Sequence, residues 1–143
     1  MKPRNPNLPY QMLPVGGSEG GGGGWSSETP PVDELARANS SSKVLARALE
    51  AAGEVRPAGS AAHHIVAGSA PDALAARTVL QNYGIGINDA ENGVFLPAEQ
   101  HARLHTNAYY NAVNNALANA KSQDDVIRIL GTIKSRLKSG GFP

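Results

Sequence analysis

The side chains best suited to chemistry are four histidines, which fall into two groups. His63 and His64 are adjacent, whereas His101 and His105 have the spacing H-x-x-x-H. The 143-residue chain contains no cysteine, which excludes disulfides, cysteine nucleophiles and thiolate metal sites. Imidazole can ligate a cation or transfer a proton near neutral pH. These residues therefore point to metal binding, to acid–base chemistry, or to both.

The spacing of His101 and His105 allows both side chains to reach one cation. Positions i and i+4 of a helix lie on the same face. If the helix instead begins at Thr106, a favourable N-cap residue, the pair lies in the turn before it and can still converge. The alternative for this pair alone is two solvated histidines.

The adjacent pair adds a geometric constraint. Neighbouring side chains of an extended segment point to opposite faces, so His63 and His64 do not easily ligate the same ion. One of them can complete a three-histidine site with His101 and His105. The other then lies beside the open coordination position, where it can take a proton from water. This is a hydrolytic arrangement.

Asn92 is the other candidate, and it has two compatible interpretations. It precedes Gly93, and an asparagine before glycine accepts the positive φ of a hairpin turn. Its side-chain amide can also orient an imidazole or a substrate oxygen.

The elements that must position these residues begin with an apolar run over residues 61–66, which predicts a strand. Ser69 can cap, and Pro71 can open, a helix that reaches Tyr83. The apolar side chains expected to face inward from that helix are Leu74, Val79 and Leu80.

Two β-prone segments, Ile85-Gly86-Ile87 and Val94-Phe95-Leu96, flank Asn92-Gly93 and predict a hairpin. Helical patterning follows Pro97 and continues to Ala120, with Tyr109, Tyr110, Val113 and Leu117 on one side.

A last helix is predicted to begin at Ser122, with Asp124 and Asp125 in its first turn, and to end at Gly140. Its expected core stripe is Val126, Leu130, Ile133 and Leu137.

The length allows one domain, or one small domain with an appendage. Residues 1–31 are predicted to be a flexible Pro- and Gly-rich arm, and residues 57–143 the main domain. Between them, residues 32–56 predict a helical linker, in which Asp33 caps a turn through Ala38. Ser41 or Ser42 caps a second helix that ends at Gly53. No apolar run has the length of a membrane span, and no Sec-type signal is expected.

The formal net charge of +1 neither requires nor excludes a polyanionic partner. Late basic residues of the last helix can contact phosphates or simply complement the helix dipole. The weak candidates for nucleic-acid contact are Arg77, Arg103, Lys134, Arg136 and Lys138.

Three segments together resemble the AHH nucleases, a branch of the HNH (ββα-metal) endonuclease superfamily. They are Ala62-His63-His64-Ile65-Val66, the stretch from Gly84 to Pro97 (GIGINDAENGVFLP), and His101 with His105 followed by Tyr109. The resemblance covers residues 60–118. It implies an α+β fold with a small ββα-metal core and additional helices, to which the composition adds a disordered Pro- and Gly-rich N-terminal arm.

The resemblance also implies roles for the candidate residues. His63, His101 and His105 would bind one divalent metal ion, such as Mg, Mn, Ni or Zn. His64 would be the general base that activates water, and Asn92 would hold that base in orientation through its side-chain amide or the neighbouring backbone. The implied reaction is hydrolysis of phosphodiester bonds in DNA.

AHH nucleases are common as toxin domains of bacterial polymorphic toxins and secreted effectors. The resemblance thus implies an antibacterial toxin, moved by a specialised secretion system into the cytoplasm of a target cell, and a cognate immunity protein. The alternatives are a ribonuclease with the same site, a catalytically inert binding module, and a structural histidine–metal domain.

Overall fold

The centre of the fold is a two-stranded antiparallel sheet, seen in a computed structural model that describes residues 38–143. Strand β1 (Ser60–His64) pairs with β2 (Gly93–Pro97), with Ser60 opposite Pro97 and His64 opposite Gly93. The strand expected in the apolar run 61–66 is thus confirmed. Because side chains alternate along a strand, β1 directs His63 and His64 to opposite faces of the sheet.

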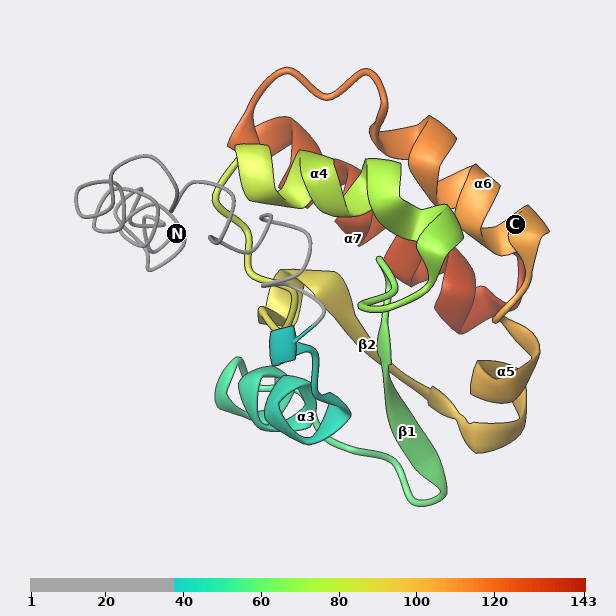
Figure 1. The fold of residues 1–143 in the computed structure, drawn as a ribbon. Helices are drawn as coiled ribbons and strands as arrows, with labels where there is room; N and C mark the ends of the chain where they lie inside the picture. The colour runs from blue at the N-terminus through green and yellow to red at the C-terminus, as the bar shows by residue number, and fades with distance from the viewer. Residues whose placement is uncertain (1–37) are drawn as a thin grey trace.

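Helices cover both faces of this sheet (Figure 1). On one side lies α3 (Ser42–Ala51), and on the other lie α4 (Leu74–Asn82), α6 (Asn107–Leu117) and α7 (Gln123–Ser139). The short helix α5 (Ala98–Arg103) directly follows β2. Two single-turn 3-10 helices, η1 (Pro71–Ala73) and η2 (Ala90–Asn92), precede α4 and β2. The α+β class expected from the sequence is confirmed.

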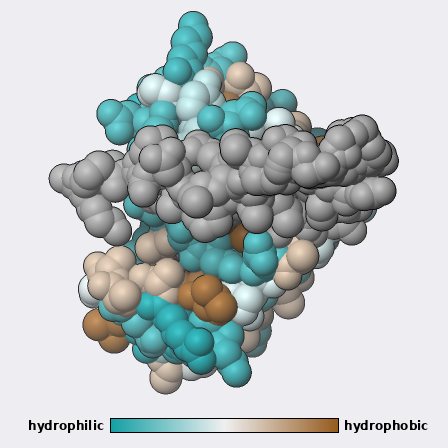
Figure 2. Space-filling model, turned by 60° about the vertical axis from the view of Figure 1, so that its left-hand side comes forward, coloured by the Kyte–Doolittle hydropathy of each residue, from teal (hydrophilic) through white to brown (hydrophobic). Residues whose placement is uncertain are grey.

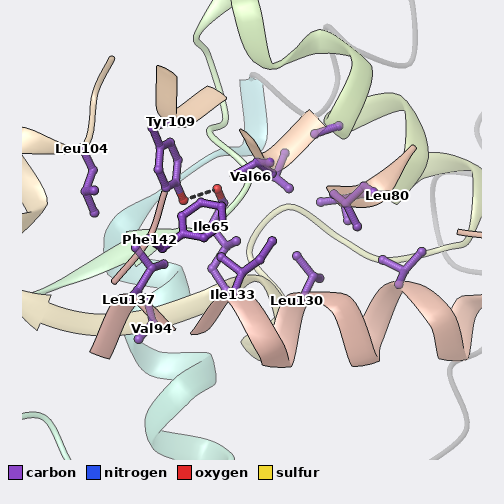
Figure 3. Packing of buried hydrophobic residues seen from close by; sticks show 14 of the residues in the cluster. Ile65, Val66, Leu80, Val94, Leu104, Tyr109, Leu130, Ile133, Leu137 and Phe142 are labelled. Carbon is purple, nitrogen blue, oxygen red and sulfur yellow. Dashed lines mark hydrogen bonds between the residues drawn. The ribbon is translucent and has the colours of Figure 1, made fainter. Parts of the chain in front are cut away.

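Each face of the sheet has its own apolar core. The major core joins β2 and the two residues after β1, Ile65 and Val66, to α4, α6 and α7, and Figure 3 shows the packing of its side chains around Ile65 and Tyr109. The minor core lies beneath α3 and consists of Leu45, Ala46, Leu49, Ala62 and Phe95. His63 therefore lies on the major-core side of β1, and His64 on the side of α3.

Helix α3 packs directly on the sheet. A Cβ atom added at Gly93 would lie 2.6 Å from Leu45 Cδ1, so the helix approaches β2 as closely as a glycine permits. The second helix of the predicted segment 32–56 is thus in the same packed unit as the strands. The predicted arm over residues 1–31 and the turn that begins at Asp33 lie outside the described residues.

Three helix starts follow their predicted caps. The hydroxyls of Ser41, Thr106 and Ser122 accept hydrogen bonds from the backbone N–H three residues later, at 3.2, 3.2 and 3.0 Å. Helix α7 ends at Gly140, whose φ of 82° is in the left-handed region that favours glycine. Its predicted stripe of Val126, Leu130, Ile133 and Leu137 is buried.

The hairpin predicted around Asn92-Gly93 is wrong. Residues 85–87 form no strand, and β2 pairs with β1 instead. Asn92 ends the helix η2, and Gly93 has an extended φ of −129°. No non-glycine residue within 38–143 has a positive φ, so the turn type that favours Asn-Gly is not formed in this part of the chain.

The helices between the two strands and after β2 also differ from prediction. The first begins as η1, the residue before it is Ala70, and Ser69 does not cap it. Leu74 is 48% exposed, because the buried face of this segment repeats through Ala73, Ala76, Arg77 and Leu80. The helical pattern predicted up to Ala120 is interrupted at residues 104–106, between α5 and α6.

The described surface is mostly hydrophilic on the face shown in Figure 2, with hydrophobic residues in small separate groups. Within residues 38–143, no helix has the length and apolar character needed to cross a membrane.

Candidate active site

All four histidines line one cleft of about 300 Å³. His63 and His64 come from the end of β1, His101 from α5 and His105 from the turn before α6. The remaining walls are formed by Ser40, by residues 67–70 and by Tyr110. The fold thus brings together two histidine groups that are separated in the sequence.

His63 is 2% exposed, and a neighbouring tyrosine fixes its protonation. Its Nε2 lies 2.9 Å from the hydroxyl oxygen of Tyr109, and that hydroxyl donates its proton to the Ile65 carbonyl at 2.6 Å (Figure 3). Burial, and then the neighbouring Tyr110, raise the pKa of Tyr109, which keeps the hydroxyl protonated. A hydroxyl has one proton to donate, so His63 Nε2 must donate to the tyrosine oxygen. The lone pair of the His63 ring is consequently on Nδ1.

That Nδ1 atom is buried and has no hydrogen-bond partner among the described residues. Burial, followed by the charges of His101, His105 and His64, lowers the pKa of His63 to about 3. A neutral imidazole with a buried, unpartnered lone pair is unusual, since such an atom ordinarily finds a partner. A metal ion would satisfy it.

Two of the three separations among the rings of His63, His101 and His105 match the spacing that one cation would require, and the third is longer. Their centres are 5.1 Å apart for His63–His101, 5.1 Å for His101–His105 and 6.2 Å for His63–His105. Three imidazoles bound through metal–nitrogen distances of about 2.0–2.1 Å would have ring centres about 5 Å apart. Within residues 38–143, no group of three or more acidic or histidine side chains is already arranged as a metal site. The three imidazole rings must therefore rotate before their nitrogen atoms can bind the same ion.

His101 and His105 have more room to turn than His63. His101 is half-buried on α5, and burial, followed by the charges of His105 and His64, lowers its pKa. His105 is exposed, with Nδ1 3.3 Å from the hydroxyl of Tyr110. Helix α5 itself is anchored on α7, because Gln100 Nε2 donates to the Leu137 carbonyl at 2.7 Å.

His64 has a different partner on the other face of β1. Its Nε2 lies 2.9 Å from Oδ1 of Asn88, and burial lowers its pKa while this hydrogen bond raises it. Asn88 is the only hydrogen-bond partner of the His64 ring within residues 38–143, so Nδ1 is left without one in this part of the chain.

Asn92 is fully buried and acts on the backbone. Its Oδ1 accepts from Val66 N at 2.8 Å, and its Nδ2 donates to the carbonyls of Val66 at 3.2 Å and Ile87 at 2.9 Å. Its own carbonyl accepts from Ile65 N at 2.8 Å. Its amide makes no hydrogen bond to the His64 ring, so of the two expected routes to the base only the one through neighbouring backbone is left. Asn92 instead fixes the chain that leaves β1, two residues after His64.

A comparison with protein families matches residues 44–136 to AHH, described as a nuclease family of the HNH/ENDO VII superfamily with conserved AHH. The match includes all four histidines and covers more than half of the chain. The chain belongs to the AHH nuclease family. Searches of curated proteins and of solved structures give no significant match. The AHH triplet of this nuclease is Ala62-His63-His64, which closes β1 at the cleft.

The basic residues considered for nucleic-acid contact are not equally available in this AHH nuclease. Arg77 is 1% exposed, and its Nη1 donates to the carbonyls of Ala67 at 2.9 Å and Ala70 at 2.7 Å. It braces the loop that walls the cleft, so the expectation that it contacts a nucleic acid is corrected.

The other four basic candidates remain at least partly exposed. Lys134 is paired with Glu54, and Arg136 donates to the Gly141 carbonyl at 2.9 Å and lies over the ring of Phe142. Arg103 and Lys138 are exposed.

Two residues of the AHH nuclease site were not assigned roles from the sequence. Tyr109 was expected on the same side of its helix as Val113 and Leu117. A tyrosine hydroxyl buried with such residues requires a partner, and that requirement was the available signal. Asn88 lies inside the segment that resembles AHH nucleases, but no local pattern connects it to a histidine. Its role depends on tertiary contacts.

Proposed function

We propose that this protein is a metal-dependent endonuclease that hydrolyses phosphodiester bonds of DNA. His63, His101 and His105 bind one divalent cation, and His64 is the general base. The observation that carries the proposal is the meeting of four histidines in one cleft, one with a buried and unpartnered nitrogen. Membership of a nuclease family is consistent with this chemistry.

The three ligand histidines suit a hydrolytic cation. They are uncharged as ligands, so a bound divalent ion keeps its full charge to stabilise the phosphorane and to assist the departing 3′ oxygen. His63 is held by Tyr109 within the core, and His101 and His105 close on it from α5 and the following turn. The nuclease then depends on added metal and is inhibited by a chelator.

His64 performs the proton transfer. Its Nε2 proton is directed to Asn88, so the lone pair of Nδ1 is available to take a proton from the attacking water. As that proton leaves, the water oxygen forms a bond to phosphorus and the bond from phosphorus to the 3′ oxygen breaks. General-base assistance contributes about 10²- to 10⁴-fold to the rate of such a reaction.

The proposed biological role is that of an antibacterial toxin. In this proposal a specialised secretion system delivers the nuclease to the cytoplasm of a target cell, and a cognate immunity protein protects the producer. The support is the likeness of the quoted motifs to AHH nucleases of bacterial toxins. Induced expression inside a bacterium tests this role: the wild-type chain should degrade chromosomal DNA and stop growth, whereas His64→Ala should not.

The biochemical test uses the purified full chain with plasmid DNA and, separately, with RNA. Each substrate is incubated with Mg²⁺, Mn²⁺, Ni²⁺ or Zn²⁺, and with EDTA. His64→Ala is compared with Asn115→Ala, an exposed substitution on α6. DNA cleavage that EDTA and His64→Ala abolish, and that Asn115→Ala retains, supports the proposal. Cleavage of RNA but not DNA would show that the substrate is RNA and that the site is the one proposed. If neither substrate is hydrolysed although metal binds, the protein is an inert binding module.

A further inference from the structure

The Asn88 side chain makes hydrogen bonds in three directions. Its Oδ1 is 2.9 Å from His64 Nε2 and also accepts from the backbone N–H of Ser41 at 3.0 Å. Its Nδ2 donates to the carbonyl of Asn39 at 2.6 Å. One carboxamide therefore connects the proposed general base to the segment that leads into α3.

The two backbone contacts determine which tautomer of His64 is present. A backbone N–H can only donate and a backbone carbonyl can only accept, so Ser41 and Asn39 fix which end of the Asn88 amide is oxygen. The atom facing His64 is therefore an acceptor, and His64 Nε2 must carry the proton. The remaining ring nitrogen, Nδ1, keeps the lone pair that a base requires.

Asn88 is itself held in place from both sides. Asp89 closes a tight turn beside it, accepting from Gly86 N at 2.7 Å through Oδ2, while Asp89 N donates to the Gly86 carbonyl at 3.1 Å. Asn92 holds the preceding residue through the Ile87 carbonyl. The carboxamide of Asn88 is thus presented by a braced loop.

The segment of residues 39–41 is packed against the cleft wall on the other side. Ser40 lines the cleft, and a Cβ atom added at Gly68 would lie 2.0 Å from Ser40 Oγ. Ser41 is also the N-cap of α3, so its backbone is fixed by the start of that helix. Asn88 is therefore clamped between two supports that do not include His64.

We propose that Asn88 is the positioning residue of His64, which it holds in the Nε2-protonated tautomer with the backbone of residues 39–41 as its brace. The inference rests on the proposed function, because it presumes that His64 is the base. Loss of the carboxamide frees the imidazole to rotate and to protonate Nδ1, which removes the lone pair from the water. Substrate binding is unaffected because Asn88 does not line the cleft.

The test compares three full-length variants. Asn88→Ala removes the acceptor. Asn88→Asp keeps an acceptor for His64 and Ser41 but loses the donor to Asn39. The matched control is Asn114→Ala, because the Asn114 amide also bridges two backbone groups, accepting from Ala76 N at 3.0 Å and donating to the Asp72 carbonyl at 2.8 Å.

Two readouts are measured on each variant. The first is kcat and KM for plasmid cleavage. We expect Asn88→Ala to lower kcat about 10- to 100-fold, as is typical when an imidazole loses its orienting partner, with KM unchanged. The second is the tautomer of His64, from long-range ¹H–¹⁵N correlation spectra of the metal-free protein. The Nε2-protonated tautomer should be the only one in wild type, Asn88→Asp and Asn114→Ala, whereas the Nδ1-protonated tautomer should appear beside it in Asn88→Ala.

The inference is overturned if Asn88→Ala keeps both the tautomer and kcat, or if Asn114→Ala alters them to the same extent. If Asn88→Ala does not fold, Asn88→Asp provides the test. The inference is overturned if His64 is no longer protonated on Nε2 in Asn88→Asp. Failure of the proposed function has a separate signature, which is wild-type activity in His64→Ala. The tautomer measurement does not depend on that result.

Discussion

His63 and His64 are neighbours in the chain but have independent supports. His63 points into the major core, where its partner is the buried hydroxyl of Tyr109. His64 points to the side of α3, where its partner is the partly exposed amide of Asn88. Strand alternation separates the two side chains, and different elements hold each of them. One dipeptide can therefore supply both a metal ligand and a base without one support disturbing the other.

The two supports also differ in what maintains them. The ring of Tyr109 is buried in the major core, with the ring of Phe142 at 5.6 Å between centroids, and its hydroxyl bridges His63 and the Ile65 carbonyl. The amide of Asn88 is fixed by hydrogen bonds to backbone groups near α3. We expect metal affinity to follow the integrity of the major core, and proton transfer to follow the contacts of α3.

The largest expected effect comes from removing the base itself. His64→Ala should lower the rate of DNA cleavage by about 10²- to 10⁴-fold, since general-base assistance is lost. The three proposed ligands are untouched, so the affinity for divalent metal should be nearly unchanged. Plasmid nicking gives the rate and isothermal titration gives the affinity.

His63→Ala is the matched comparison for that variant. It should weaken metal binding, because the buried Nδ1 is removed from the site. Equal losses of metal affinity in His63→Ala and His64→Ala would show that the two roles are interchanged.

The next effect tests the support of His63. Tyr109→Phe removes the hydroxyl that links His63 to the Ile65 carbonyl and leaves both buried groups without that partner. We expect metal affinity to fall about 10- to 100-fold and the free energy of unfolding to fall by about 1–3 kcal/mol. Isothermal titration and urea denaturation measure these changes.

Tyr83→Phe is a suitable control for the loss of a tyrosine hydroxyl. Tyr83 donates to the Ala120 carbonyl at 3.2 Å, away from the cleft-lining residues. The Tyr83→Phe substitution should lower the free energy of unfolding slightly and leave the metal affinity unchanged. An unchanged metal affinity in Tyr109→Phe as well would mean that the core does not support the ligand.

Local sequence signals were sufficient to predict some of the structure around the two histidines and in α7. The predicted cap, stripe and terminal glycine of α7 all depend on residues within one helix, and all three are confirmed. The adjacent histidines required only strand alternation to be placed on opposite faces. Thr106 was one of two helix starts that the sequence left open, and the structure selects it, with His105 in the turn before α6.

Non-local features were not accessible in the same way. Asn92-Gly93 fits a hairpin turn and the end of a 3-10 helix equally well, and only pairing with β1 decides between them. Arginine is a common surface residue, but Arg77 is buried because the loop 67–70 supplies two carbonyl acceptors for its guanidinium group. The partners of His63 and His64 depend on which elements meet in space, and no spacing along the chain specifies that.

A smaller effect is expected from the packing of α3 on the sheet. In Gly93→Ala, the new methyl group would collide with Leu45 and Leu49, which are both fully buried. The collision would push α3 away from β2 at the position that pairs with His64. Overpacking of this kind costs about 1–3 kcal/mol of the free energy of unfolding. Urea denaturation measures the loss, and kcat should fall while metal affinity is retained.

The control for that variant is Gly131→Ala in α7. No atom lies within 4 Å of a Cβ added there, so the substitution should stabilise the protein by up to about 1 kcal/mol through helix propensity. A stability loss in Gly131→Ala comparable to that of Gly93→Ala would contradict close packing of α3 as the cause.

The smallest expected effect concerns the ion pair that joins the two sides of the molecule. Glu54, in the loop after α3, pairs with Lys134 of α7, and their side chains are 26% and 21% exposed. Because both groups are partly solvated, Glu54→Gln should lower the free energy of unfolding by at most about 1 kcal/mol. The loss should shrink at high salt, which screens partly exposed charges. Cleavage rate and metal affinity should not change, because each histidine is held by its own face of the sheet. A fall in either would mean that the two supports are coupled through this pair.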